Sequence, residues 1–229
     1  MTIGADRLRL ATLFSGGKDS VYAIYLAQQY GWEVVQTVVM VPEQEGAHLF
    51  HVPNIGLAPV VSRALGIGPM VFSTGGEEEQ ELEDLEHALG IIECDGVLTG
   101  ALASDYQWSR INRVCHRLGL RTYSPLWRKD QRRVVEEEIA AGFEILFSGV
   151  AAEGLGQEWL GRRLDADALC ALSKVRGLNL AGEGGEFETI VLDGPNFKRR
   201  VALEGCAPRW NRRSGVLHVD SASLRSKRS

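Results

Sequence analysis

The sequence predicts an α/β protein in which a parallel β-sheet with helices on both faces is followed by a smaller region of mixed helices and strands. Up to residue 124, short apolar runs alternate with amphipathic segments, which is typical of repeated strand–helix units. After Pro125 the alternation gives way to shorter, strand-rich pieces. A chain of 229 residues with 45% hydrophobic and 24% charged side chains can bury a substantial core without disulfides.

The N-terminal part begins with an apolar run at residues 8–14 that stops at Gly16 and Gly17, after which apolar residues recur with helical spacing. This predicts a strand, a tight turn and a helix. Because right-handed crossovers connect parallel strands, helices are expected on both sheet faces. Further strands are predicted at 33–41, 70–72, 96–100 and 121–123, and further helices at 60–65, 77–89 and 104–118.

The C-terminal part is predicted to hold two helices and several short strands. The helices are expected at 131–141 and 166–175, and the strands at 144–150, 178–181, 189–192 and 199–203. The last residues, 223–229, are expected to fray. We place a domain boundary near Pro125, which gives a first domain of residues 1–124 and a second of residues 125–229.

The charge balance argues against a protein that coats nucleic acids, because 25 Lys and Arg against 30 Asp and Glu leave a net charge of −5. Acidic residues concentrate between Glu77 and Glu86, where leucine spacing predicts a helix with a solvated acidic face. The four cysteines lie far apart and are interpreted as reduced thiols, mostly in the core. No signal peptide is visible and no apolar run approaches the ~20 residues of a membrane span, so a cytoplasmic protein without a membrane partner is expected.

The first motif that carries chemistry joins the first strand to the first helix and reads Ser15-Gly16-Gly17-Lys18-Asp19-Ser20. Two glycines allow a sharp turn that brings N–H groups close to an anion, and the start of a helix adds partial positive charge. Phosphate is the natural ligand of such a loop. It is not a Walker A loop, which needs a glycine where Thr12 stands and Ser or Thr where Asp19 stands.

The second motif is Gly182-Glu183-Gly184-Gly185-Glu186-Phe187-Glu188-Thr189. Its three carboxylates repel one another unless a cation or hydrogen-bond donors offset them. The glycines favour a loop, and a solvated acidic turn is the alternative interpretation. The combination with a phosphate-binding loop favours a functional role.

Together the two motifs resemble a known family. The first is similar to the pyrophosphate loop of the ATP pyrophosphatases, which cleave ATP to AMP and pyrophosphate while adenylating an acceptor. The second, followed by Asp193-Gly194-Pro195-Asn196-Phe197, makes the chain resemble the diphthine–ammonia ligases, whose pattern includes G-E-G-G-E-[YF]-E-T and D-x-P-x-F. The likeness covers nearly the whole chain and implies a Rossmann-like sheet of the adenine nucleotide alpha hydrolase type. This chain departs from the family pattern at Trp108 and Asn196.

The resemblance implies an AMP-forming carbon–nitrogen ligase. In this reaction ATP, with Mg²⁺, adenylates the carboxylate of diphthine on translation elongation factor 2, and ammonium then gives diphthamide, AMP and pyrophosphate. Two alternatives stay open, namely a ligase of the same loop type acting on another carboxylate or a tRNA base, and a non-catalytic nucleotide sensor. Apart from the tRNA alternative, no nucleic acid partner is expected. Assembly into a homo-oligomer is left open.

Candidate site residues fall into three groups. Lys18, Asp19 and Glu186 are expected to act in catalysis, with Asp19 also orienting the metal. ATP is expected to contact Ser15, Gly16, Gly17, Lys18, Asp19, Ser20, Gly100, Ser104, Tyr106 and Gln107, the last four because they follow a predicted parallel strand. The acceptor and ammonium are expected at Glu183, Gly184, Gly185, Glu186, Glu188 and His51.

Overall fold

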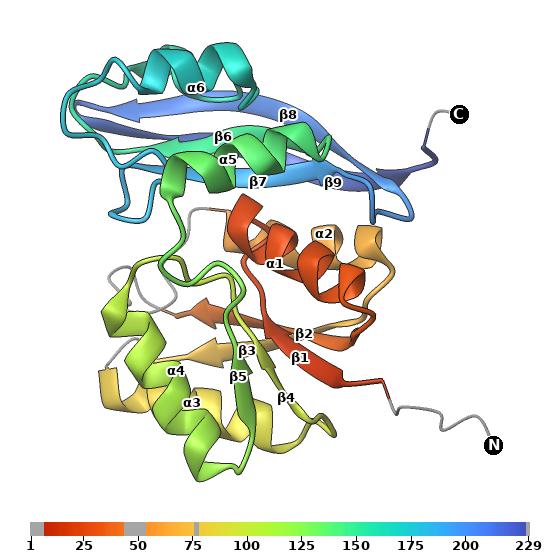
Figure 1. Ribbon diagram of the computed structural model, residues 1–229. Coiled ribbons are helices and arrows are strands. Elements are labelled where there is room, and N and C mark those ends of the chain that lie inside the picture. The colour runs from red at the N-terminus through yellow and green to blue at the C-terminus, as the bar shows by residue number, and fades with distance from the viewer. Residues whose placement is uncertain (1–6, 44–53, 76–77, 228–229) are drawn as a thin grey trace.

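The computed structural model describes residues 7–43, 54–75 and 78–227, which contain two β-sheets (Figure 1). The first sheet is parallel, with strand order β3-β2-β1-β4-β5. Its strands are β1 (Arg9–Leu13), β2 (Glu33–Pro42), β3 (Pro69–Thr74), β4 (Gly96–Leu98) and β5 (Arg121–Tyr123). The chain builds outward from β1 to β3 and then returns to the other side of β1. This confirms the predicted Rossmann-like sheet, in which the strand order reverses between β1 and β4.

Helices cover both faces of the parallel sheet. Helices α1 (Lys18–Gln29) and α2 (Ala58–Leu65) lie between the two sheets, whereas α3 (Glu78–Gly90) and α4 (Asp105–Arg117) lie on the opposite face (Figure 1). A short 3-10 turn, η1 (Ile55–Leu57), precedes α2. Helix α4 begins where the sequence predicts, because the Ser104 side chain accepts a hydrogen bond from the backbone N–H of Gln107 at 3.3 Å.

The second sheet is antiparallel, with strand order β7-β6-β9-β8. Its strands are β6 (Glu144–Val150), β7 (Phe187–Asp193), β8 (Arg200–Asn211) and β9 (Ser214–Arg225). Helices α5 (Gln131–Ala140) and α6 (Ala166–Leu172) and the turn η2 (Gln157–Trp159) complete this part. The sheet lies across α1 and α2 from the parallel sheet, so these two helices are covered on both sides (Figure 1).

Two sequence predictions in this part are wrong, and a third is correct only in part. Residues 178–181 form a loop rather than a strand. The strand predicted at 199–203 is only the beginning of β8, which pairs along its whole length with β9. The expected frayed end contributes Leu224 and Arg225 to β9, where Arg225 pairs with Glu204 at 3.1 Å. Most side chains of β8 are exposed, so alternating hydrophobicity does not mark this hairpin in the sequence.

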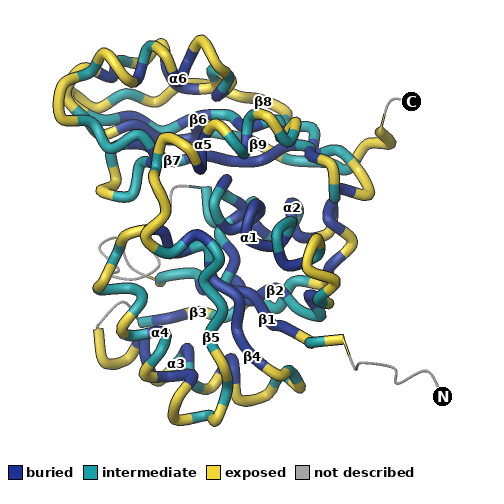
Figure 2. Tube along the Cα trace, viewed as in Figure 1, coloured by how far each residue is buried: buried dark blue, intermediate teal, exposed yellow. Residues whose placement is uncertain are grey.

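The two sheets share a hydrophobic core. Tyr22 and Tyr25 of α1 pack edge-on against Phe143, which precedes β6, with ring centroids 6.0 and 5.6 Å apart. The same buried cluster extends from β1 through α1 and α2 to β6 and β7 (Figure 2). A second cluster lies between the parallel sheet and helices α3 and α4. The boundary predicted near Pro125 therefore separates two sheets that do not have separate cores.

Two expectations about burial are also wrong. Glu81 is fully buried rather than part of a solvated acidic face, because α3 turns this position towards the sheet. Among the cysteines, Cys115 is buried and Cys94 half-buried, but Cys170 and Cys206 are exposed. All four are free thiols, as predicted. Across the described part of the chain, none of the helices has the length and apolar character needed to span a bilayer.

Candidate active site

A cavity of about 270 Å³ lies at the carboxyl ends of β1 and β4. Ser15 follows β1 and Gly100 follows β4, and both line it. Glu188 of β7 lines it from the antiparallel sheet. Open α/β sheets bind their ligands where the strand order reverses, which is this position. Both halves of the chain therefore contribute to a single binding site.

Glycines shape the loop between β1 and α1. Gly16 has a φ of +78°, a left-handed conformation that other residues rarely adopt. A Cβ atom at Gly17 would lie 3.3 Å from the carbonyl oxygen of Thr189. The approach at Gly100 is closer still, because a Cβ atom there would lie 2.7 Å from the backbone carbon of Asp19. The end of β4 is thus packed directly on the start of α1, and only glycine fits between them.

Strand β7 holds this loop from the side of the second sheet. The backbone N–H of Lys18 donates a hydrogen bond to Thr189 Oγ1 at 3.1 Å. The backbone N–H of Val191 donates to the carbonyl oxygen of Gly16, also at 3.1 Å. Because β7 is an edge strand, its outer backbone groups are available for this contact. The loop therefore closes an otherwise unpaired sheet edge.

Lys18 supplies a buried positive charge. Its side chain is 1% exposed, and its Nζ donates to both carboxylate oxygens of Asp19, at 2.7 and 2.6 Å. Burial by itself lowers the pKa of Lys18. The nearby carboxylates, Asp19 first and then Glu138, outweigh burial, so that the pKa of Lys18 is raised. Lys18 consequently stays an ammonium at neutral pH and can attract phosphate.

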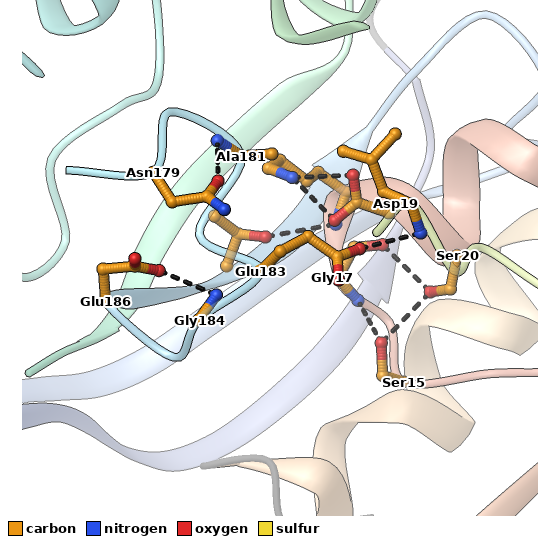
Figure 3. Close-up of polar contacts among 12 residues, drawn as sticks. Ser15, Gly17, Asp19, Ser20, Asn179, Ala181, Glu183, Gly184 and Glu186 are labelled. Atoms are coloured by element: carbon orange, nitrogen blue, oxygen red, sulfur yellow. Dashed lines mark hydrogen bonds and ion pairs between the residues drawn. The ribbon is translucent and has the colours of Figure 1, made fainter. Parts of the chain in front are cut away.

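Glu183 and Glu188 add carboxyl groups to the cavity. The Oε1 atom of Glu183 accepts a hydrogen bond from the backbone N–H of Leu102 at 2.8 Å (Figure 3). Burial and then the negative charge of Asp19 raise the pKa of Glu183. Burial also raises the pKa of Glu188 to about 7, against the opposing effect of the Lys18 ammonium. Glu188 can therefore gain or lose a proton near neutral pH.

The rest of the cavity wall is largely apolar. Val38 and Met40 of β2 face it together with Leu13, Ile55 and Ile111. A flat apolar group such as a nucleobase fits a surface of this kind. The cavity thus combines an apolar side, a loop that carries a cation and a side rich in carboxyl groups.

Comparison with known proteins decides the family. The model of the diphthamide synthase N-terminal domain matches residues 8–122, and the model of the diphthamide synthase C-terminal domain matches residues 130–224. The chain belongs to the diphthamide synthase family. The two matched segments correspond to the parallel and the antiparallel sheet, so the site lies where the two family domains meet.

Relatives of this diphthamide synthase family member are named diphthine–ammonia ligase. The relative from Schizosaccharomyces pombe is 33% identical over 218 residues, which cover 86% of this chain and 36% of that protein. The relative from Bos taurus is 31% identical over 225 residues, which cover 86% of this chain and 83% of that protein. The chain therefore spans a minor part of the first relative and most of the second. A solved structure, a "predicted subunit of tRNA methyltransferase" from Methanocaldococcus jannaschii, is 17% identical with a TM-score of 0.46, covering 82% of this chain and 98% of that chain.

In this diphthamide synthase family member, most of the residues expected to bind ATP line the cavity. They are Ser15, Gly17, Lys18, Asp19, Ser20, Gly100 and Gln107. The Oγ atoms of Ser15 and Ser20 lie 3.2 Å apart, and Ser20 Oγ donates to the carbonyl oxygen of Gly17 at 3.0 Å (Figure 3). Gly16 shapes the loop without lining the cavity itself.

Two further candidates for the nucleotide pocket are placed elsewhere. Ser104 caps α4 and does not line the cavity. The Tyr106 side chain packs against the core between the parallel sheet and helices α3 and α4, where the guanidinium of Arg110 lies 3.3 Å from its ring centroid. Burial raises the pKa of the Tyr106 hydroxyl. This arrangement does not support Tyr106 as a pocket residue, because α4 turns its ring towards the core.

Of the residues expected to bind the acceptor, some line the cavity and others do not. Glu183 and Glu188 line the cavity, but Glu186 does not. The Oε2 atom of Glu186 accepts a hydrogen bond from the backbone N–H of Gly184 at 2.8 Å, and its side chain lies away from Asp19 (Figure 3). Gly184 and Gly185 are exposed. The remaining candidate, His51, lies outside the described residues.

Two residues of the site are not assigned a role by any pattern in the sequence. Thr189 belongs to the second motif, yet only the structure shows that its hydroxyl meets the Lys18 N–H. Glu138 of α5 is fully buried, and its carboxyl group lies near Lys18 and Asp19. No pattern distinguishes Glu138, because it stands in a run of three glutamates. The contact between α5 and α1 sets which of them faces inward.

Proposed function

We propose that this chain is a diphthine–ammonia ligase that uses ATP to convert the carboxylate of diphthine, on translation elongation factor 2, into the amide of diphthamide. The observation that carries the proposal is that an anion-binding loop and two half-buried glutamates, Glu183 and Glu188, face one cavity. The names of the relatives support the same reaction. A carboxylate does not react with ammonia in water because it lacks a good leaving group, and adenylation supplies AMP as one.

The reaction has two steps. A carboxylate oxygen of diphthine first attacks the α-phosphorus of ATP, and the bond to the β-phosphate breaks to release pyrophosphate. The nitrogen of ammonia then attacks the carbonyl carbon, the bond to AMP breaks, and one proton is released. Lys18 and the N-terminal N–H groups of α1 stabilise the negative charge that develops on the leaving pyrophosphate. The apolar side around Val38 and Met40 receives the adenine ring.

The carboxyl groups of the cavity suit Mg²⁺, which prefers oxygen ligands and commonly binds through phosphates and one or two carboxylates. Within the described residues, no three His, Cys, Asp or Glu side chains are already grouped as ligands. Asp19, at the loop, is the residue that would hold the ion. Both its oxygens accept hydrogen bonds from Lys18, so the ion would compete with the Lys18 ammonium for the Asp19 carboxylate. Bound there, Mg²⁺ would neutralise charge on the phosphates.

The carboxyl side of the cavity serves cationic reactants. Ammonium and the trimethylammonium group of diphthine are both positive, and Glu183 and Glu188 attract positive charge. Ammonium must lose a proton before its nitrogen can attack. Glu188, whose pKa is raised to about 7, can accept that proton near neutral pH. Glu186 remains a predicted acceptor residue on the outer side of the same loop.

The test supplies the protein with ATP, ammonium and elongation factor 2 that carries diphthine. We expect AMP and pyrophosphate in equal amounts, and a mass change of the modified histidine from carboxylate to amide. Formation of ADP, or AMP release that does not depend on the acceptor, would contradict the proposal. AMP release with tRNA in place of the elongation factor would indicate an RNA-modifying ligase, and ATP binding without AMP release would indicate a sensor.

A further inference from the structure

Helix α5 places a buried carboxyl group behind the cavity. Glu138 is fully buried and does not line the cavity. By geometry neither of its carboxyl oxygens has a hydrogen-bond partner among the described residues, although the neighbouring Asp19 carboxyl contributes to raising its pKa. A buried polar group without partners destabilises a fold. The burial of Glu138 therefore costs stability, which is typical of polar groups placed at functional sites.

The groups that face Glu138 belong to the nucleotide site. Burial raises the pKa of Glu138 well above its ordinary value, and the next largest influences are the opposing charges of Lys18 and Asp19. The effect is mutual, because Glu138 also helps to keep Lys18 protonated. An independent contact fixes α5 against α1, since the Tyr22 hydroxyl donates a hydrogen bond to Glu137 Oε2 at 3.3 Å.

We propose that Glu138 is a positioning residue of the nucleotide site, which acts through the Lys18–Asp19 pair and does not touch the substrate. This inference rests on the proposed function. The Lys18 ammonium directs its short contacts at both oxygens of Asp19. When Mg·ATP binds, Lys18 would interact with phosphate and Asp19 would help to hold the ion, so the contact between them would weaken. Glu138 offers the ammonium a second carboxyl group during this exchange, so that a buried charge is not left without a partner.

The test replaces Glu138 in the full chain and measures both stability and binding. Glu138→Leu keeps the volume and removes the carboxyl group. We expect its melting temperature to equal or exceed that of the wild type, because replacing buried ionic groups by apolar ones is often neutral or stabilising. We expect its affinity for Mg·ATP, measured by calorimetry, to fall about tenfold or more. Glu138→Gln, which keeps a carbonyl oxygen as hydrogen-bond acceptor, should retain more affinity than Glu138→Leu.

The matched control is Glu136→Leu, the same change two positions away on α5. It should leave the affinity for Mg·ATP unchanged, since the Glu136 side chain is 51% exposed and pairs with Arg132 rather than with Lys18. A purely structural role of Glu138 predicts that stability and affinity fall together, so a lower melting temperature or an unfolded Glu138→Leu variant overturns the inference. Wild-type affinity in a folded Glu138→Leu variant also overturns it. Failure of the wild type to bind Mg·ATP would instead refute the proposed function, and the inference with it.

Discussion

The backbone N–H of Lys18 donates a hydrogen bond to the side-chain hydroxyl of Thr189 at 3.1 Å, although 171 positions separate the two residues. Lys18 is the first residue of α1, and Thr189 follows Glu188 in β7. The contact therefore fastens the anion-binding loop to the strand that carries the carboxyl side of the cavity. A displacement of α1 or of β7 would therefore disturb this hydrogen bond and the element at its other end.

Thr189→Val removes this hydroxyl and keeps the branched shape of the side chain. We expect a loss of about 1 kcal/mol in the free energy of unfolding, because the Lys18 N–H is left without its acceptor. The KM for ATP should rise, since the loop loses one of its attachments to β7. Denaturant titration and AMP release at varied ATP measure the two effects. Thr189→Ser keeps the hydroxyl and should resemble the wild type. Identical stability and KM of the two variants would show that the hydroxyl does not hold the loop.

Lys18→Ala and Asp19→Ala should both remove turnover, with an increase in the activation barrier on the order of 3 kcal/mol for a lost preorganised charge contact. Asp19→Ala should destabilise the fold more, because the Lys18 side chain that loses its partner is 1% exposed, whereas Asp19 is 26% exposed. Thermal melts and acceptor-dependent AMP release test this pair. Near-normal turnover of Asp19→Ala would exclude Asp19 as the metal ligand.

Glu188 should make stability depend on pH. Because its pKa is raised to about 7 in the folded chain, ionisation of Glu188 weakens the fold as pH rises through the window from its ordinary pKa up to about 7. Glu188→Gln cannot ionise, so its stability relative to the wild type should increase between pH 5 and pH 8, by at most about 3 kcal/mol. Melting temperatures of both proteins across this range provide the measurement. A constant difference would show that Glu188 titrates normally.

Gly100→Ala should disturb the contact between β4 and α1. The added Cβ atom would lie 2.7 Å from the backbone nitrogen of Ser20, so one of the two elements has to move. We expect destabilisation of about 1–3 kcal/mol, as for other overpacked positions, and weaker ATP binding. Gly56→Ala is a suitable control because no atom lies within 4 Å of the added Cβ there. Unchanged ATP affinity in a stable Gly100→Ala variant would speak against this loop as the phosphate site.

Glu186→Gln should leave ATP affinity nearly unchanged, because Glu186 lies outside the cavity. It should weaken the use of diphthine or ammonium, since its loop continues directly into the carboxyl side of the site. Lys18→Ala is expected to show the reverse pattern. ATP calorimetry paired with AMP release at varied acceptor and ammonium separates the two. If Glu186→Gln abolished ATP binding, its loop would belong to the nucleotide instead.

The sequence alone determined the parallel sheet and the loop at its centre. Strand β6 was predicted at its observed bounds, 144–150, and β5 at 121–123, because apolar runs and turn residues are local signals. Residues 15–20 were assigned to phosphate for the same reason, since glycines, a helix start and a lysine act together over six positions. The long hairpin of β8 and β9 has no comparable local signal, because most of β8 is exposed and carries no alternating pattern.

Only the tertiary structure decided which acidic side chains face the cavity. Glu186 and Glu188 stand two positions apart in one motif, yet only Glu188 lines the cavity, since the contacts of β7 with the loop set its orientation. Glu138 lies beside the site, although its neighbours in the sequence are those of an ordinary acidic helix. Its position depends on α5 packing against α1, which brings together segments more than a hundred residues apart. Local patterns encode which face of an element is buried, whereas the partner of a buried charge is set by packing between distant segments.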